Sequence, residues 1–422
     1  MNPLKSFVKR CTPRWAKQRI KNALRRAPLE IPAPVLGLGE DAVSMRHANG
    51  SPPRRALVSY LTKPFRIGWE HPDSVQFSNL GIARSMVRAL NELGYAVDVI
   101  EYFDKTFVPA RQYDLFLGHR TDNFASLAAQ LKPEAPRIYY VSTMYWADNN
   151  ARTEERYQAL EERRGVALKR NRTLADEDGA MSLADAVFGC GNERCRRTYA
   201  AHFPGARMLN NAAYADDHFE RTAKEPSQSG SHFFFFAGSG NVHKGLDLLL
   251  EAFKDSPAHL WITQVIHPDF GAAYQRELQE CPNIHLVGPL AMRRAAYYEL
   301  ADRCAYAIFP SCAEGQPGSV VECMHHGLIP VVSAESHLDT DGFGITLADC
   351  RIETIRATVE DLARRPAEWR QEMFRAARRE ALREHSEVMF VDRVRQVIVE
   401  AEAAAQSRVA GQRLAPTMRG KP

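Results

Sequence analysis

The sequence has no hydrophobic run of the length that a membrane-spanning helix needs. Its eight cysteines are scattered, and none forms a C-x-x-C pair or a cysteine–histidine spacing typical of a metal site. We therefore expect reduced cysteines of a cytoplasmic protein and no bound metal. Hydrophobic content of 45% and charged content of 25% are ordinary for a globular protein, and 422 residues suffice for two domains.

Acidic residues are missing from residues 1–26, which carry nine lysines and arginines. The rest of the chain has 46 basic and 51 acidic residues, a net charge of −5, so general nucleic-acid binding is disfavoured. Within residues 1–26, apolar and basic side chains occupy opposite helical faces, which suits peripheral contact with the inner face of the plasma membrane. A solvated, disordered tail is the alternative, and organellar transit peptides have a similar composition.

Short apolar runs alternate with helical patterns along most of the chain, as expected of parallel sheets covered by helices. A polar, turn-rich stretch interrupts this alternation once, which indicates a linker. We predict an α/β fold with two Rossmann-like domains and a central cleft, the default ligand site. The predicted segments are 1–54 (basic segment and connector), 55–215 (first domain), 216–230 (linker), 231–386 (second domain), 387–408 (final helix) and 409–422 (disordered tail).

The stretch Phe309–Val332 has two glutamates, eight positions apart, around a glycine-containing turn. Its apolar flanks predict a strand, a helix starting near Ser319, and a second strand. The start of that helix offers backbone amides and a partial positive charge, and Gly318 lets a phosphate approach closely. Glu314 on the loop and Glu322 one turn into the helix suit binding of a sugar nucleotide. A capping box formed by Ser319 and Glu322 is the alternative, and it needs no ligand.

A glycine-rich turn follows the predicted strand at 231–237 and opens another helix. It contains Gly238, Ser239 and Gly240, with Lys244 near the helix start, where amides and a lysine together bind phosphate. The spacing matches neither a Walker A loop nor a dinucleotide fingerprint. Because a helix dipole disfavours a cation at this position, Lys244 indicates an anionic ligand rather than a merely solvated lysine.

Lys244 in such a turn, followed 70 residues later by the pair Glu314 and Glu322, resembles the retaining GT-B glycosyltransferases of the family-4 type. The similarity is good over 231–350 and looser in the first domain. It implies a GT-B fold and transfer of a hexosyl group from a nucleoside diphosphate sugar with retention. The implied acceptor is a glycan or lipid-linked glycan in cell-surface polysaccharide synthesis, and no metal or other cofactor is expected. The final helix, 387–408, would cross back onto the first domain.

The resemblance also implies roles for the site residues. Lys244 would bind the donor pyrophosphate, and Glu322 would bind the ribose hydroxyls. Glu314 would face the sugar hydroxyls and stabilise charge at the reacting carbon. Gly318 and Ser319 would present backbone amides to the diphosphate.

One departure from the family pattern concerns the donor phosphates. The family usually has an arginine after the glycine that ends the first strand, and that residue is Ser239 here. Leaving-group stabilisation would then rest on Lys244, the helix dipole and a residue of the first domain. His119, at the end of a predicted strand, would contact the sugar or its departing phosphate, and Arg120 beside it could replace the arginine. A surface-loop histidine is the alternative for His119.

Two other functions stay open. A sugar-nucleotide epimerase with the same architecture would bind the nucleotide sugar but need no acceptor. A non-catalytic GT-B-like partner subunit would account for Ser239. Replacing Glu314 or Lys244 by alanine discriminates between them, because only an enzyme depends on these side chains for turnover.

Overall fold

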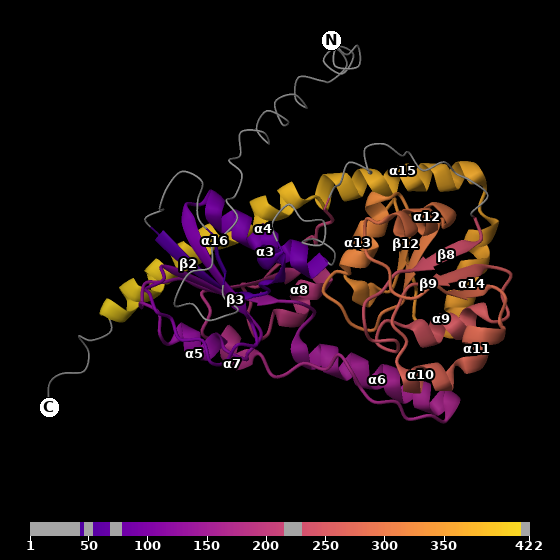
Figure 1. Ribbon diagram of the computed structural model, residues 1–422, viewed down its shortest axis with the longest axis horizontal. Coiled ribbons are helices and arrows are strands. Elements are labelled where there is room, and N and C mark those ends of the chain that lie inside the picture. The colour runs from indigo at the N-terminus through magenta and orange to yellow at the C-terminus, as the bar shows by residue number, and fades with distance from the viewer. Residues whose placement is uncertain (1–42, 46–53, 68–77, 215–229, 415–422) are drawn as a thin grey trace, which may run out of the picture.

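The structure is a computed structural model that describes residues 43–45, 54–67, 78–214 and 230–414 (Figure 1). Its described part forms two α/β units, each built on one sheet, which confirms the predicted two-domain architecture. The predicted basic segment 1–26 and almost all of the predicted linker lie outside the described residues. Among the described helices, none is both long and apolar enough to cross a membrane.

The first sheet has seven strands within the described residues, in the order β1-β3-β2-β4-β5-β6-β7. Neighbouring strands are parallel, except that β1 pairs antiparallel with β3 at the sheet edge. The predicted connector 1–54 therefore includes an edge strand, and its last residue begins β2. The strands are β1 (Val43–Met45), β2 (Arg54–Tyr60), β3 (Tyr95–Glu101), β4 (Leu115–His119), β5 (Arg137–Val141), β6 (Ala186–Cys190) and β7 (Arg207–Leu209).

Helices cover both faces of this sheet, which explains why its central strands are buried and almost wholly apolar. In α4, Ile82, Met86 and Leu90 repeat at helical spacing and enter the core of the first domain. Gly94, at a φ of 86°, follows the end of α4 and turns the chain into β3. The helices packed around this sheet include α3 (Lys63–Arg66), α4 (Ser78–Glu92), α5 (Phe124–Ala128), α7 (Asp178–Met181) and α8 (Glu193–Tyr199).

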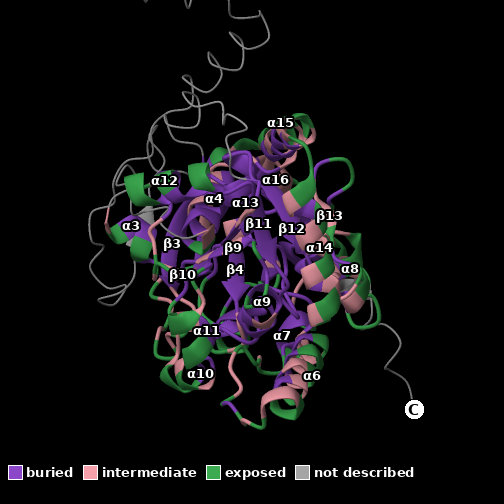
Figure 2. Ribbon diagram, turned by 90° about the vertical axis from the view of Figure 1, so that its right-hand side faces the viewer, coloured by how far each residue is buried: buried purple, intermediate pink, exposed green. Residues whose placement is uncertain are grey.

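The second sheet has six parallel strands among the described residues, in the order β10-β9-β8-β11-β12-β13. This is the doubly wound order. Strands are added outward on one side of the first strand, β8, and then outward on its other side from the fourth strand, β11. Figure 2 shows β11 and β12 buried at the centre of the molecule. The strands are β8 (His232–Phe235), β9 (His259–Ile262), β10 (Ile284–Leu286), β11 (Tyr306–Phe309), β12 (Ile329–Val332) and β13 (Ile345–Thr346).

The helices of the second domain pack around this sheet, and the outer face of α10 is exposed (Figure 2). They are α9 (Leu246–Phe253), α10 (Pro268–Ala273), α11 (Gln275–Glu280), α12 (Ala295–Arg303), α13 (Gly318–His325), α14 (Ile352–Arg364) and α15 (Ala367–Glu384).

Helix α6 (Trp146–Arg164) leaves the first domain and runs along the second (Figure 1). Tyr157 and Leu160 on its buried face, and Leu168 just after it, belong to the hydrophobic core of the second sheet. The predicted boundaries, which assigned 55–215 to the first domain, miss this crossing. The chain crosses because these apolar side chains are buried by the second domain and not by the first.

Helix α16 (Glu387–Leu414) crosses back to the first domain, as predicted. Phe390, Val394 and Ile398 enter the core of the first sheet. The prediction of a disordered tail from residue 409 is wrong for 409–414, which continue the helix. The physical reason is that no proline interrupts the chain before Pro416, so the helix extends almost to the residue before it.

Candidate functional site

A cavity of about 760 Å³ lies between the domains, at the carboxyl ends of both sheets. In the first sheet, β2 and β4 flank the position where the strand order reverses, and in the second sheet β8 and β11 do so. Open α/β sheets bind ligands at such positions. Of the predicted site residues, the cavity lining includes His119, Gly238, Ser239, Lys244, Glu314, Gly318 and Ser319. Glu322 and Gly240 are outside this lining.

Lys244 and Glu314 form a buried ion pair in which Lys244 Nζ donates to Glu314 Oε1. Ser311 Oγ donates to the same oxygen at 2.8 Å. Burial would raise the pKa of Glu314, but Lys244, His243 and Arg172 outweigh it and hold the pKa at about 2. Burial also lowers the pKa of Lys244, and Glu314 opposes that shift. The pair is therefore charged at neutral pH, and the carboxylate balances the charge that was predicted to bind phosphate.

The position of Lys244 is fixed by a glycine immediately after it. Gly245 has a φ of 81° and is the N-cap residue of α9. A Cβ atom there would lie 2.4 Å from the carbonyl oxygen of Pro310, so only glycine allows this approach. The turn after β8 is thus packed directly against the loop after β11, which brings Lys244 to Glu314.

Two helix N-termini, those of α4 and α13, meet at the cavity. A Cβ atom on Gly318 would lie 2.3 Å from the Cβ of Ser78, the first residue of α4. The N-cap residue of α13 is Pro317, without a side-chain cap, and the amide of Val320 is the first to donate to its carbonyl oxygen. The amides of Gly318 and Ser319 come before Val320 in the first turn of the helix. They are in the position where helix N-termini bind anions.

The capping-box alternative is wrong, because Pro317 and not Ser319 occupies the cap. Glu322 instead pairs with Arg293, whose Nη1 lies 2.9 Å from Glu322 Oε2, and both side chains are buried. The same Nη1 donates to the carbonyl oxygen of Tyr214 at 3.1 Å. The ribose contact of Glu322 stays a prediction, and Arg293 was missed because a loop arginine carries no motif.

His119 is only 6% exposed, so the surface-loop alternative is wrong. Its Nδ1 lies 2.9 Å from the carbonyl oxygen of Tyr140, which can only accept, so Nδ1 carries the hydrogen. Burial lowers the pKa of His119 to about 3, and the ring is neutral at pH 7. Its Nε2 is therefore an acceptor, suited to a hydroxyl donor in the cavity that His119 lines.

Two arginines of the first domain also line the cavity, Arg120 and Arg172. Both have a left-handed backbone, with φ values of 65° and 67°. Arg120 could be expected here from the sequence, whereas Arg172 could not, because it lies in a long charged stretch without a recognisable motif. Within the described ranges, no group of three or more histidine, cysteine, aspartate or glutamate side chains could hold a metal ion.

The second domain is similar to a known protein family. Residues 231–364 match the sequence model of the family described as glycosyl transferases group 1. No curated protein sequence matches the chain significantly.

Solved structures resemble both domains of the chain in fold. Sucrose-phosphate synthase from Thermosynechococcus elongatus superposes with a TM-score of 0.57 at 14% identity, over 83% of this chain and 100% of that one. Anabaena HepE in complex with UDP-glucose gives a TM-score of 0.53 at 11% identity, over 82% and 99%. TarM, with a TM-score of 0.49 and 13% identity, covers 67% of this chain, which spans 54% of TarM. The two structures with TM-scores above 0.5 show that the chain has the GT-B fold, and within it residues 231–364 match the glycosyl transferases group 1 model.

Proposed function

We propose that this chain transfers a glycosyl group from a nucleoside diphosphate sugar to a glycan or lipid-linked glycan, with retention at the anomeric carbon. The observation that carries the proposal is the buried Lys244–Glu314 pair. It lies where the strand order reverses, in one cavity with two helix N-termini and the neutral His119.

The donor diphosphate would lie between Lys244 and the amides of Gly318 and Ser319, which together supply a cation and two backbone donors. The sugar would then extend toward Glu314 and His119. The neutral His119 ring accepts a hydroxyl hydrogen at Nε2, whereas an imidazolium could not. Because HepE was solved with UDP-glucose, uridine nucleotides are the first donors to test.

The proposed reaction breaks the bond between the anomeric carbon and a phosphate oxygen. The acceptor oxygen bonds to that carbon on the same face, and its proton passes to the departing phosphate. No protein nucleophile is needed for this course. The protein contributes positioning and stabilisation of the developing negative charge on the diphosphate.

The acceptor side of the proposal concerns the first domain and residues 1–26. A basic amphipathic segment would keep the protein at the inner face of the plasma membrane, near a lipid-linked acceptor used in cell-surface polysaccharide synthesis. Deleting residues 1–26 should release the protein from membrane fractions. An unchanged membrane fraction would contradict this part of the proposal.

A second candidate is a non-catalytic partner subunit. Ser239 replaces the arginine usual in the family, and Glu314 already balances the charge of Lys244. Both features reduce the stabilisation available to a leaving diphosphate. Release of nucleoside diphosphate from a donor sugar would exclude this candidate, whereas binding without turnover would favour it.

The first test of the proposal, which concerns donor binding, is a thermal-shift measurement with UDP, GDP, ADP and their sugars. A ligand at a hundred times its Kd adds about 2.7 kcal/mol to the stability of the native state and raises its melting temperature. We expect one nucleotide series to do so, and Lys244→Ala to abolish the shift. Lys254→Ala is the matched control, since Lys254 is exposed at the other end of α9. No shift with any nucleotide would refute the proposal.

A further inference from the structure

The charge balance of the cavity leaves the donor diphosphate without a second cation from the second domain. Each phosphate of a nucleoside diphosphate sugar carries one negative charge. Lys244 is paired with Glu314, and Ser239 carries no charge. If the proposed function is right, on which this inference rests, another cation must face the phosphates.

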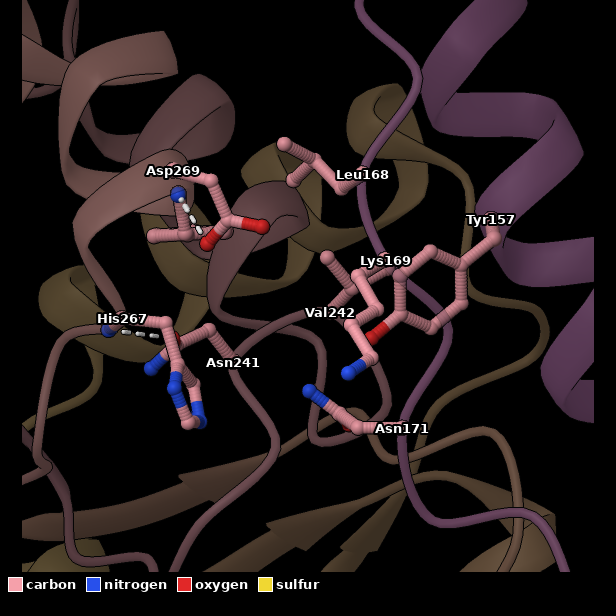
Figure 3. A pocket seen from close by; sticks show the side chains of 9 residues that line it. Tyr157, Leu168, Lys169, Asn171, Asn241, Val242, His267 and Asp269 are labelled. Atoms are coloured by element: carbon pink, nitrogen blue, oxygen red, sulfur yellow. Dashed lines mark hydrogen bonds between the residues drawn. The ribbon is translucent and has the colours of Figure 1, made fainter.

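Residues 165–174, here called the strap, follow α6 and run across the glycine turn of the second domain. Leu168, Lys169 and Asn171 of the strap line a pocket of about 260 Å³ together with Asn241 and Val242 of the turn, and Figure 3 shows these five side chains close together. The strap thus reaches the turn that carries Ser239 and Lys244, although it precedes the linker in the sequence.

Arg172 of the strap touches this turn directly. A Cβ atom on Gly240 would lie 3.0 Å from the Cγ of Arg172, so the aliphatic stem of Arg172 packs on Gly240. The side chain of Arg172 is exposed to the cavity whose lining it shares with Ser239 and Lys244. Arg172 therefore lies beside the turn in which Ser239 stands where an arginine is usual in the family.

The backbone of the strap is held in place from α6. Asn149 Nδ2 donates to the carbonyl oxygen of Arg172 at 3.0 Å. The Asn150 side chain accepts from the amide of Leu174 at 2.8 Å and donates to its carbonyl oxygen at 2.9 Å. These bonds maintain Arg172 in its left-handed conformation, which residues with a side chain rarely adopt. Such conformations persist where the surrounding structure imposes them, often at binding sites.

Arg120 is the competing cation, and it acts on the other side of the cavity. Burial raises the pKa of Glu177, a first-domain carboxyl, and the charge of Arg120 partly opposes that shift. Burial raises the pKa of Glu314, and the charges of Lys244, His243 and Arg172 lower it. Burial lowers the pKa of Lys244, Glu314 opposes that shift, and Arg172 adds to it. Because the stem of Arg172 also packs on Gly240, in the turn that carries Ser239 and Lys244, Arg172 is the arginine on the phosphate side.

We infer that Arg172, supplied by the strap of the first domain, is the second cation for the donor diphosphate and takes the place of the missing arginine at Ser239. A guanidinium can bind two phosphate oxygens at once, which suits a diphosphate better than a second point charge. The donor would then be bound by both domains, with Lys244 on one side of the diphosphate and Arg172 on the other.

The test is isothermal titration of the full chain with UDP, GDP and ADP, and with the corresponding nucleosides. For the diphosphate that binds, Arg172→Ala should weaken affinity about 10- to 100-fold, the size expected for charge-assisted hydrogen bonds. The affinity for the nucleoside should stay unchanged, because it has no phosphate. Arg172→Lys should recover part of the loss.

Arg170→Ala is the matched control. Arg170 lies on the same strap but pairs with Glu154, at 3.0 Å, and is not part of the cavity lining. An equal loss of diphosphate affinity in Arg170→Ala would show that binding depends only on the packing of the strap against the second domain. That result would overturn the inference. Unchanged diphosphate affinity in Arg172→Ala, with a loss in Lys244→Ala, would overturn the inference but leave the proposed function intact. If the wild type binds no nucleoside diphosphate, both are wrong.

Discussion

Among single residues, the candidate site is organised by compensation between opposite charges. Lys244 is neutralised by Glu314, and Glu322 is neutralised by Arg293. All four side chains are buried or nearly so, and breaking one partner of a buried pair typically costs 3–5 kcal/mol. A donor diphosphate would compete with Glu314 for the lysine.

Replacing Glu314 by glutamine tests this competition. Without the carboxylate, Lys244 is an unpaired buried cation, so the melting temperature without ligand should fall. Nucleoside diphosphate should bind about tenfold more tightly, equivalent to 1.4 kcal/mol, because no internal anion competes for the lysine. Turnover should decrease, since the carboxylate near the sugar is lost.

Glu335→Gln is the control for this variant. Glu335 pairs with the exposed Arg194 at 3.0 Å, and such surface pairs contribute little. Equal affinities of wild type and Glu314→Gln for nucleoside diphosphate would contradict competition at Lys244.

Among the helices, α6 and α16 each pack into the core of the domain to which they do not belong by sequence. α6 belongs to the first domain by sequence, yet its apolar face completes the second core. α16 follows the second domain and completes the first core. Each domain therefore depends on a helix that the chain supplies by crossing the interface, and both domains are tied together on two sides (Figure 1).

Two adjacent residues of α16 allow a direct test of this packing. Ile398 is fully buried in the core of the first domain, whereas Val399 is 50% exposed on the other face of the helix. Ile398→Ala should lower the free energy of unfolding by about 2–5 kcal/mol through lost burial and a cavity. Val399→Ala should change it by less than about 0.5 kcal/mol. Urea unfolding followed by circular dichroism measures both, and similar effects would show that α16 is not docked as described.

At the scale of the whole molecule, the interior holds several histidines that are neutral because they are buried. Burial lowers the pKa of His119 and of His243 to about 3, and that of His325 to about 4. His385 is shifted in the same direction by burial. In the unfolded chain these rings bind protons near pH 6.5, so the unfolded state binds more protons below that pH.

The contribution of these neutral histidines to the free energy of unfolding should therefore be fully present above pH 6.5. It should decrease as the pH falls toward 3. Each such histidine contributes about 1.4 kcal/mol per pH unit below 6.5, or roughly 2 kcal/mol at pH 5. Urea unfolding at pH 7 and pH 5 should show a smaller loss for His119→Gln than for the wild type. The same replacement at the exposed His202 is the control. An identical loss in His119→Gln and wild type would contradict the assignment of His119 as a neutral buried ring.

The elements and the phosphate-binding turns could be predicted from the sequence because their signals are local. The glycines around Lys244 and the apolar runs beside Glu314 specify turns, strands and helix starts within about ten residues. The crossing of α6 was missed because its few apolar side chains, such as Leu160, are diluted by charged neighbours.

The sequence by itself determined the alternation of strands and helices, the two glycine-rich turns and the residues available for phosphate binding. Only the tertiary structure decided that Lys244 meets Glu314, that Glu322 is held by Arg293, and that the strap brings Arg172 to Ser239. Local patterns fix the conformation of short segments, because steric limits and backbone hydrogen bonds act between near neighbours. Pairing between segments separated by many tens of residues depends on how the two cores pack, and no short pattern specifies that.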